Sequence, residues 1–366
     1  MKIFKPHILD SHPYVGGSTR EKQDDGKQVF KLSSNENPLG ASPMAVAAIR
    51  RALDNLHEYQ YHDDGLFLEK LSAHFEGELL ADQFLPANSG LELLDIICRG
   101  FLSPGTSCIL SSPTFMAYKN FAELAGATVV DVPLHKENYM LDVRGIISAI
   151  DDTTRVIFVA NPNNPTGSLF PDRDIRALAA AIPDHVVLVY DEAYHHYVER
   201  RDYVRATEFI AADKNVIGLH SFSKAFGLAA LRLGYLFSTP KISSYLRHFR
   251  RPFMISSLAM EAGMAALDDH DHLARTIRTN SIEKRLLYKE LNNLGIPYWS
   301  SDANFILIHP QINSLRFCQY LLQNGVMVRS AIPLGAPGLV RISIGTREMN
   351  EALVKSVYNL HYLKVL

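Results

Sequence analysis

Short apolar runs alternate with amphipathic stretches along the middle of the chain. The apolar runs are rich in valine and isoleucine and end at turn residues; they cover residues 107–112, 127–134, 155–162, 186–192 and 215–221. Runs with so little polar alternation are typical of strands buried on both faces of a parallel sheet. Helical patterns lie between them, as in residues 65–75, where Phe67, Leu71 and Phe75 share one face. The alternation predicts βαβ units and an α/β fold, with a mostly parallel sheet flanked by helices.

The rhythm of strands and helices changes near residue 240, where prolines interrupt the pattern. A long helical stretch over about residues 256–295 follows, and then two strand-like runs, "ANFILIHP" and "LVRISIG". The first part of the chain shows little periodicity. We therefore predict an N-terminal arm (1–35), a large domain (36–245) and a smaller α/β domain (246–366).

Composition and charge narrow the class of protein. The chain has 366 residues, of which 47% are hydrophobic, so it can bury a sizeable core. Its net charge of −2 argues against a nucleic-acid or membrane-surface protein, and no apolar stretch approaches a membrane span. Cys98, Cys108 and Cys318 show neither a disulfide pattern nor metal-ligand spacing. The N-terminus lacks the apolar run of a signal peptide. We expect a cytoplasmic protein without a metal site.

Polar segments follow three of the predicted strands. "NPNNPTG" (161–167) follows one strand, "DEAY" (191–194) the next and "SFSK" (221–224) the third. Each segment has an ordinary interpretation as a turn, a helix cap or local packing. The carboxyl ends of parallel strands meet at one edge of a sheet, however, and ligands collect there. We therefore expect these segments to form a site together.

The residue types in this set match the needs of pyridoxal 5′-phosphate. That cofactor requires a lysine for its aldehyde and a carboxylate for its ring nitrogen, which Lys224 and Asp191 can supply. A nearby carboxylate keeps the ring nitrogen protonated. The phenolic oxygen and the phosphate need further polar partners. Candidates for the phenolic oxygen are Asn164 and Tyr194, and candidates for the phosphate are Ser221, Ser223 and Arg232.

These three segments, in this order and spacing, resemble the fold-type I aminotransferases that use pyridoxal phosphate. Within that group the chain is similar to the histidinol-phosphate aminotransferase family. The segments that carry this second resemblance are "KLSSNENPLG" (31–40), "PY" (13–14) and "LVRISIGTREMNEAL" (339–353). The resemblance implies a transfer of an amino group to a 2-oxo acid by a homodimer whose active sites lie at the subunit interface.

The resemblance also implies roles for residues that the strand-end argument does not reach. Phe115 matches the aromatic residue that stacks on the cofactor ring, and the turn of Ser89, Gly90 and Leu91 matches one whose amides hold the phosphate. The family's aspartate is replaced by Leu91, so only a backbone contact is expected there. The implied substrate contacts are Arg341, Tyr14 and Asn35, and the tyrosine that reaches the partner subunit is Tyr61, with Tyr59 as an alternative.

The substrate stays open at this point. Histidinol phosphate with 2-oxoglutarate is the pair that the resemblance favours, and an aromatic or other amino acid is the main alternative. A lyase, decarboxylase or cyclase would use the same lysine. A dinucleotide-binding oxidoreductase is disfavoured, because no Gly-x-Gly-x-x-Gly follows a strand. The adjacent His195 and His196 are expected to point in opposite directions, which disfavours a shared metal ion.

Overall fold

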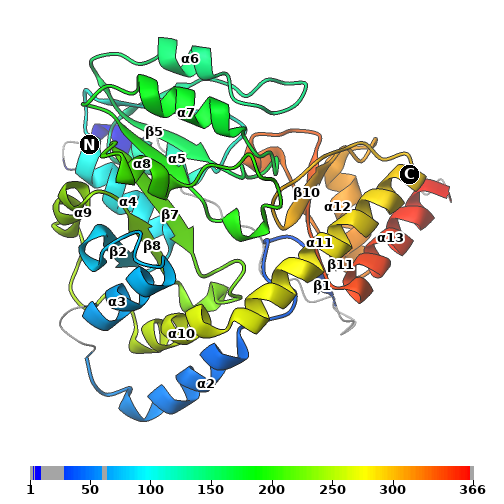
Figure 1. Cartoon of the computed structure of the whole chain (residues 1–366). Helices are drawn as coiled ribbons and strands as arrows, with labels where there is room; N and C mark the ends of the chain where they lie inside the picture. Colours follow the sequence, from blue (N-terminus) through cyan, green and yellow to red (C-terminus); the bar gives the residue numbers. More distant parts are fainter. Residues whose placement is uncertain (1–2, 4, 10–28, 60–63, 363–366) are drawn as a thin grey trace.

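A seven-stranded sheet forms the centre of the larger part of the molecule (Figure 1). The structure is a computed structural model and describes residues 3, 5–9, 29–59 and 64–362, without the side chains of residues 9, 361 and 362. The strand order is β2-β8-β7-β6-β5-β3-β4, and only β8 runs antiparallel to its neighbours. The strands are β2 (Phe84–Ala87), β3 (Ser107–Leu110), β4 (Thr128–Asp131), β5 (Thr154–Ala160), β6 (Val187–Asp191), β7 (Val216–Ser221) and β8 (Gly234–Phe237).

Helices cover both faces of this sheet because successive strand residues point to opposite sides. Val156 and Phe158 of β5 pack in one core with α4 and α5, while Ile157 and Val159 pack in another core with α3, α7 and α8. The prediction of a mostly parallel sheet flanked by helices is therefore confirmed. The helices are α3 (Gly65–His74), α4 (Gly90–Phe101), α5 (Ala117–Leu124), α6 (Val143–Ser148), α7 (Asp172–Ala181), α8 (Ala206–Ala211) and α9 (Pro240–Arg247).

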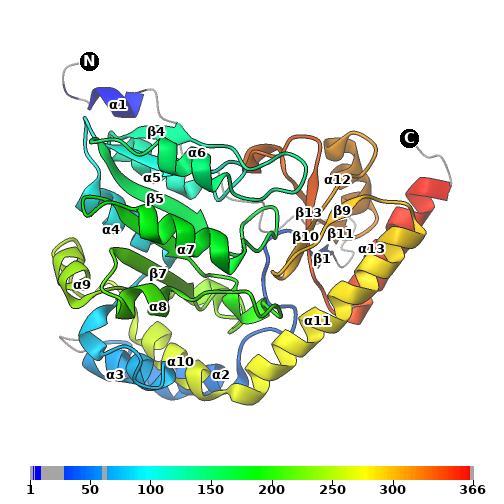
Figure 2. The same ribbon diagram turned by 45° about the horizontal axis from the view of Figure 1, so that its top comes forward.

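A second, antiparallel sheet lies in the smaller part of the molecule (right side of Figure 2). Its order is β12-β13-β10-β9, and α12 and α13 pack near it. The N-terminal β1 pairs with β11 in this part, which carries the following residues 32–41 back toward the large sheet. The elements are β1 (Phe30–Lys31), β9 (Tyr298–Trp299), β10 (Phe305–Ile308), β11 (Val326–Met327), β12 (Arg329–Ser330), β13 (Val340–Ser343), α12 (Ser314–Gln323) and α13 (Arg347–Tyr362).

The single long helical stretch predicted between the two sheets is two helices in the structure. It consists of α10 (Ser257–Asp268) and α11 (His270–Asn293), which separate at Asp269. The Asp269 carboxylate caps α11 by accepting the His272 N–H at 3.2 Å, and it accepts the Ser42 hydroxyl at 2.6 Å. This side chain thus ties the helix junction to the start of α2 (Pro43–Ala52), and α2 lies beside α10 in both views (Figures 1 and 2). Among the described residues, the remaining α-helix is α1 (Pro6–Leu9).

One strand differs from the expectation of burial on both faces. The residues of β4 are exposed or half-buried, because β4 is the last strand of the large sheet. The expected domain limits at residues 35 and 245 stay a prediction. Among the described residues, none of the helices has both the length and the apolar character needed to cross a membrane.

Candidate functional site

Three polar segments leave the large sheet at one edge. β5, β6 and β7 are parallel neighbours, and their register pairs Ala160 with Asp191 and Asp191 with Leu219. The segments after these strands, 161–167, 191–194 and 221–224, therefore begin at the carboxyl edge of the sheet. The three segments therefore lie at one edge of the sheet, as their strand ends predict, and their role as one binding site stays a prediction.

Lys224 lies in the turn after β7, and its side chain reaches the N-terminal segment. Its Nζ donates a hydrogen bond to the Ser34 carbonyl oxygen at 3.4 Å and lies 5.5 Å from the centroid of the Tyr194 ring. The Gly227 N–H donates to the Lys224 carbonyl at 3.0 Å, and Gly227 has φ = +72°. A Cβ at Gly227 would lie 2.1 Å from the Gly40 carbonyl oxygen. Glycine is therefore needed for the N-terminal segment to pack on the lysine turn.

The Asp191 carboxylate is held from two directions at the end of β6. Its Oδ1 accepts the Ala193 N–H at 3.0 Å, and its Oδ2 accepts the Tyr118 hydroxyl at 2.7 Å. Burial raises the pKa of Asp191, and the hydrogen bond from Tyr118 and the charge of Lys224 act in the opposite direction. A carboxylate offers about four acceptor positions, so the two bonds fix its orientation without saturating it.

Tyr194, Asn164 and Arg341 belong to one buried hydrogen-bond network with Asn35. The Asn35 amide donates to the Tyr194 hydroxyl at 3.0 Å, and the Asn164 amide nitrogen lies 3.5 Å from the same oxygen. Arg341, on β13, donates from Nη1 to Asn164 Oδ1 at 2.7 Å and from Nη2 to the Ser33 carbonyl at 2.8 Å. The network joins the edge of the large sheet to the small sheet.

Backbone atoms of the turn before α4 and of β7 lie close to Gly234. In the sheet register, Gly234 of β8 pairs with Ala87 of β2 on one side and with Ser221 of β7 on the other. A Cβ at Gly234 would lie 3.1 Å from the Gly90 nitrogen and 3.3 Å from the Ser89 carbonyl carbon. Ser89 has φ = +87°, and α4 begins at the next residue. Glycine thus lets the N-terminus of α4, which suits an anion, lie beside Ser221.

The other expected phosphate contacts, Ser223, Arg232 and Leu91, lie within two residues of Ser221, Gly234 and Gly90 in the sequence. The Ser223 N–H donates to Ser221 Oγ at 3.1 Å. Arg232 follows the 3₁₀ turn Ala229–Leu231 with φ = +56° and donates to the Ala229 carbonyl at 2.8 Å. The Leu91 side chain packs against the core on the α4 side of the sheet, which leaves its backbone N–H as the candidate donor.

Phe115 packs against the same core, in the segment between β3 and α5. Its ring lies edge-on to the Tyr118 ring, with centroids 5.6 Å apart. The preceding Thr114 donates from its hydroxyl to Asn163 Oδ1 at 2.8 Å. The segment that carries Phe115 is therefore tied to the segment that follows β5.

Comparison with known proteins identifies the family. The family model for aminotransferase class I and II matches residues 27–357. The chain belongs to this family. The expected fold-type I aminotransferase and its enzyme class are therefore confirmed.

Individual relatives of this aminotransferase match it along almost its whole length. Histidinol-phosphate aminotransferase from Geobacillus sp. (strain WCH70) is 36% identical and covers 97% of each chain. Histidinol-phosphate aminotransferase 2 from Pseudomonas fluorescens (strain Pf-5) is 38% identical, also with 97% of each chain covered. Histidinol-phosphate aminotransferase from Sinorhizobium meliloti, solved in complex with pyridoxal-5′-phosphate, has a TM-score of 0.87 at 25% identity, covering 98% of this chain and 99% of the other.

Two expected residues of the aminotransferase lie outside the described part of the chain. These are Tyr14 and Tyr61. The alternative to Tyr61, Tyr59, is described: 86% of its surface is exposed, and its ring centroid lies 5.0 Å from that of Phe253. The choice between the two tyrosines stays open.

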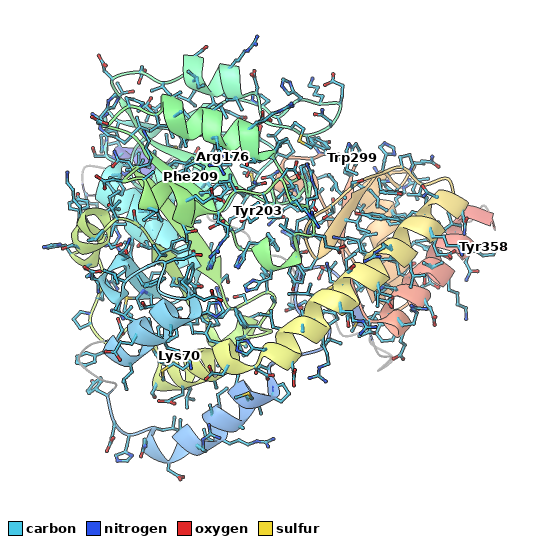
Figure 3. All side chains as sticks on the ribbon, in the orientation of Figure 1. Lys70, Arg176, Tyr203, Phe209, Trp299 and Tyr358 are labelled. Carbon is cyan, nitrogen blue, oxygen red and sulfur yellow. The ribbon has the colours of Figure 1, made fainter. Side chains whose placement is uncertain are left out.

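The expected opposite orientation of the adjacent histidines is wrong. His195 and His196 lie in a 3₁₀ turn with ring centroids 3.8 Å apart, because such a turn rotates successive residues by about 120° rather than 180°. The His195 ring also stacks on His220, with centroids 3.9 Å apart. Glu192 accepts the hydroxyl of Tyr203, which is labelled in Figure 3, and lies 3.4 Å from His220 Nε2.

This histidine cluster has the properties of a neutral, packed group. Burial lowers the pKa of His195 to about 3 and that of His220 well below its usual value. Burial also raises the pKa of Glu192. In the described part of the chain, we find no set of three or more His, Cys, Asp or Glu side chains arranged to hold a metal ion.

Sequence reasoning missed two groups of the site. Tyr118, which donates a hydrogen bond to Asp191, was assigned no role, because it lies at the start of α5 and outside the three strand-end segments. The carbonyls of Ser33 and Ser34, which accept bonds from Arg341 and Lys224, carry no side-chain signal in the sequence.

Proposed function

We propose that this aminotransferase transfers the amino group of histidinol phosphate to 2-oxoglutarate, with pyridoxal 5′-phosphate bound at Lys224. The observation that carries the cofactor site is the meeting of Lys224, Asp191 and Tyr194 at one sheet edge, with Asn35 bonded to Tyr194. The names of the Geobacillus and Pseudomonas relatives, at 36% and 38% identity, support the substrate.

The residues present fit pyridoxal phosphate. The site offers an amine, a carboxylate oriented by two hydrogen bonds, and a helix N-terminus near the strand end that carries Ser221. In this proposal the phosphate is held by the amides of Ser89, Gly90 and Leu91 and by the side chains of Ser221, Ser223 and Arg232. Phe115 stacks on the ring, and Asn164 and Tyr194 bind its phenolic oxygen.

When bound, pyridoxal phosphate supplies an aldehyde carbon that takes the amino group and a ring that withdraws electrons from the bond broken at the substrate Cα. Lys224 would hold that carbon through Nζ. With an amino substrate in its place, the freed Nζ would act as the base that takes the substrate Cα proton and as the acid that gives the proton back to the carbon receiving the amino group. The negative charge of Asp191 favours a proton on the ring nitrogen.

The substrate contacts extend from the small sheet. Arg341 is buried, and its guanidinium is oriented by Asn164 and Ser33. We propose that it binds the anionic group of the substrate, since a guanidinium forms strong paired bonds with such groups. Asn35 and Tyr14 are proposed as further substrate contacts.

The proposed assembly is a cytoplasmic homodimer whose active sites receive Tyr61 from the partner subunit, with Tyr59 as the alternative. Large apolar side chains that are exposed in one subunit support an interface near this segment: Leu53, Leu56, Tyr59 and Phe253 have 46%, 60%, 86% and 47% of their surfaces exposed. Mixing inactive Lys224→Ala subunits with Tyr61→Phe or Tyr59→Phe subunits tests this arrangement. Activity recovered by subunit exchange identifies the tyrosine that crosses the interface, and a monomer in solution refutes it.

A half-reaction screen tests the proposed substrate. The cofactor-loaded enzyme is mixed separately with histidinol phosphate, glutamate and aromatic amino acids, without an amino acceptor, and its visible spectrum is followed. Lys224→Ala, loaded in the same way, is the matched control. The expected result is a rapid spectral change with histidinol phosphate and with glutamate, which disappears in the control.

Two outcomes contradict the proposal. A response to aromatic amino acids but not to histidinol phosphate would keep the transfer reaction and replace the substrate. An identical response in Lys224→Ala would remove the lysine from the reaction.

A further inference from the structure

Tyr118 is a buried hydroxyl donor to the carboxylate of the proposed site. It lies in the first turn of α5, has no exposed surface, and donates to Asp191 Oδ2 at 2.7 Å. Its ring stacks on Phe158 of β5, with centroids 4.9 Å apart and planes 6° apart. On its other side it meets the Phe115 ring edge-on, at 5.6 Å. These contacts fix the ring, so the hydroxyl is presented to Asp191 in one orientation.

The surroundings keep this donor neutral. Burial, together with the charge of Asp191, raises the pKa of Tyr118 well above its usual value. The phenol therefore keeps its proton and remains a donor at ordinary pH. Its bond stabilises the ionised form of Asp191 against the burial that favours the protonated form.

We propose that Tyr118 is a positioning residue for the transfer reaction, which holds Asp191 in its ionised form so that the proton between the carboxylate and the cofactor's ring nitrogen stays on the nitrogen. The inference rests on the proposed function, because it requires Asp191 to face that nitrogen. Its physical content is a competition for one proton. A carboxylate that accepts a hydrogen bond is a weaker base, and the proton moves toward the ring.

The Tyr118→Phe substitution tests this role, since it keeps the stacked ring and removes one hydroxyl. The matched control is Tyr288→Phe. Tyr288 lies on α11, and its partly buried hydroxyl, which the substitution removes, accepts the Ser301 N–H at 2.8 Å. Both variants are expected to unfold at a lower temperature. Only Tyr118→Phe is expected to change the state of the ring nitrogen.

The principal readout is the ¹⁵N resonance of ring-labelled pyridoxal phosphate bound to each protein, which reports whether the nitrogen carries a proton. We expect Tyr118→Phe to move the resonance toward that of the neutral ring, and Tyr288→Phe to leave it unchanged. The half-reaction rate constant at saturating amino substrate should fall at least about tenfold in Tyr118→Phe, with a change in substrate dissociation constant below about threefold.

A second variant keeps the test valid if Tyr118→Phe does not fold. 3-Fluorotyrosine at position 118 retains the shape of the ring and makes the hydroxyl a stronger donor. The resonance should then move in the opposite direction, toward the protonated ring.

The outcomes separate this inference from the proposed function. An unchanged resonance in Tyr118→Phe, with only a lower unfolding temperature, would reduce Tyr118 to a structural residue and leave the proposed function standing. A resonance that Asp191→Asn also leaves unchanged would overturn the assignment of Asp191, and with it the role of Tyr118. A shift of similar size in Tyr288→Phe would show a non-specific effect and refute the inference.

Discussion

Replacing Gly234 by alanine separates cofactor binding from folding. Gly234 lies between Ala87 and Ser221 in the sheet, and a Cβ there would lie 3.1 Å from both the Gly90 nitrogen and the His220 carbonyl oxygen. Both distances are shorter than ordinary contacts of a Cβ atom, so the neighbours must give by a few tenths of an ångström. All of them are backbone atoms. We expect the turn that begins α4 to shift away from Ser221.

The magnitude follows from two effects. Overpacking of this kind costs about 1–3 kcal/mol of the free energy of unfolding. A shifted α4 turn also weakens bonds from its amides to the phosphate, and one hydrogen bond to a charged group contributes about 1.5–3 kcal/mol. The dissociation constant of pyridoxal phosphate should therefore rise about tenfold to a hundredfold. Fluorescence titration of the apoenzyme measures that constant, and denaturant unfolding of the apoenzyme measures stability.

Gly145→Ala is the matched control. A Cβ at Gly145 would lie 2.5 Å from a carboxylate oxygen of Asp142 and 3.0 Å from a methyl group of Val132, so it overpacks the start of α6 rather than the α4 turn. It should destabilise the apoenzyme while leaving the cofactor dissociation constant within about twofold of the wild type. If both variants weaken the cofactor equally, or if Gly234→Ala binds it normally, the turn at Ser89 does not hold the phosphate.

The remaining predictions concern the lysine, the arginine and the histidine cluster. Lys224→Ala should prevent borohydride trapping of the cofactor on the protein and lower the rate of transfer at least about a hundredfold; trapping at an unchanged level, seen by mass spectrometry, would contradict the assignment. Arg341→Gln should raise KM for histidinol phosphate about tenfold to a hundredfold with a smaller change in kcat, and an unchanged KM in steady-state assays would remove Arg341 from the substrate site. Because the pKa of His195 falls to about 3 in the folded state, the unfolded chain binds more protons between that value and about pH 6.5, and stability decreases as the pH falls through this window. For His195 alone the loss from pH 6.5 to pH 5 is about 2 kcal/mol, partly offset by the raised pKa of Glu192; denaturant unfolding at both pH values should show a smaller loss in His195→Asn, and equal losses would contradict the explanation.

The sequence predicted the parts of the site that depend on the ends of single strands. Asp191 ends one apolar run and Lys224 lies three residues after another, and parallel strands bring such ends to one edge whatever their exact order. The bond from Tyr118 to Asp191 was not predictable in this way, because it depends on where α5 packs after β3 has taken its place beside β5. The stacking of His195 on His220 likewise depends on the adjacency of β6 and β7 and on a 3₁₀ turn that the pattern did not indicate.

The N-terminal segment after β1 links the part of the site on the large sheet to the part on the small sheet. Consecutive residues bond to opposite sides: the Ser33 carbonyl accepts Arg341 of the small sheet, and the Ser34 carbonyl accepts Lys224 of the large sheet. The Asn35 side chain then donates to Tyr194 beside the large sheet and accepts from Ser343 of the small sheet, so it forms a second link between the two sheets.

This arrangement has a mechanical consequence. A displacement of the small sheet would carry Arg341 and Ser343 with it, and would pull on the same few residues that contact the lysine and Tyr194. The position of the candidate substrate arginine is therefore coupled to that of the candidate catalytic lysine through a short, buried backbone segment. Substitutions that loosen this segment, without touching either side chain, should disturb the proposed substrate and cofactor contacts together.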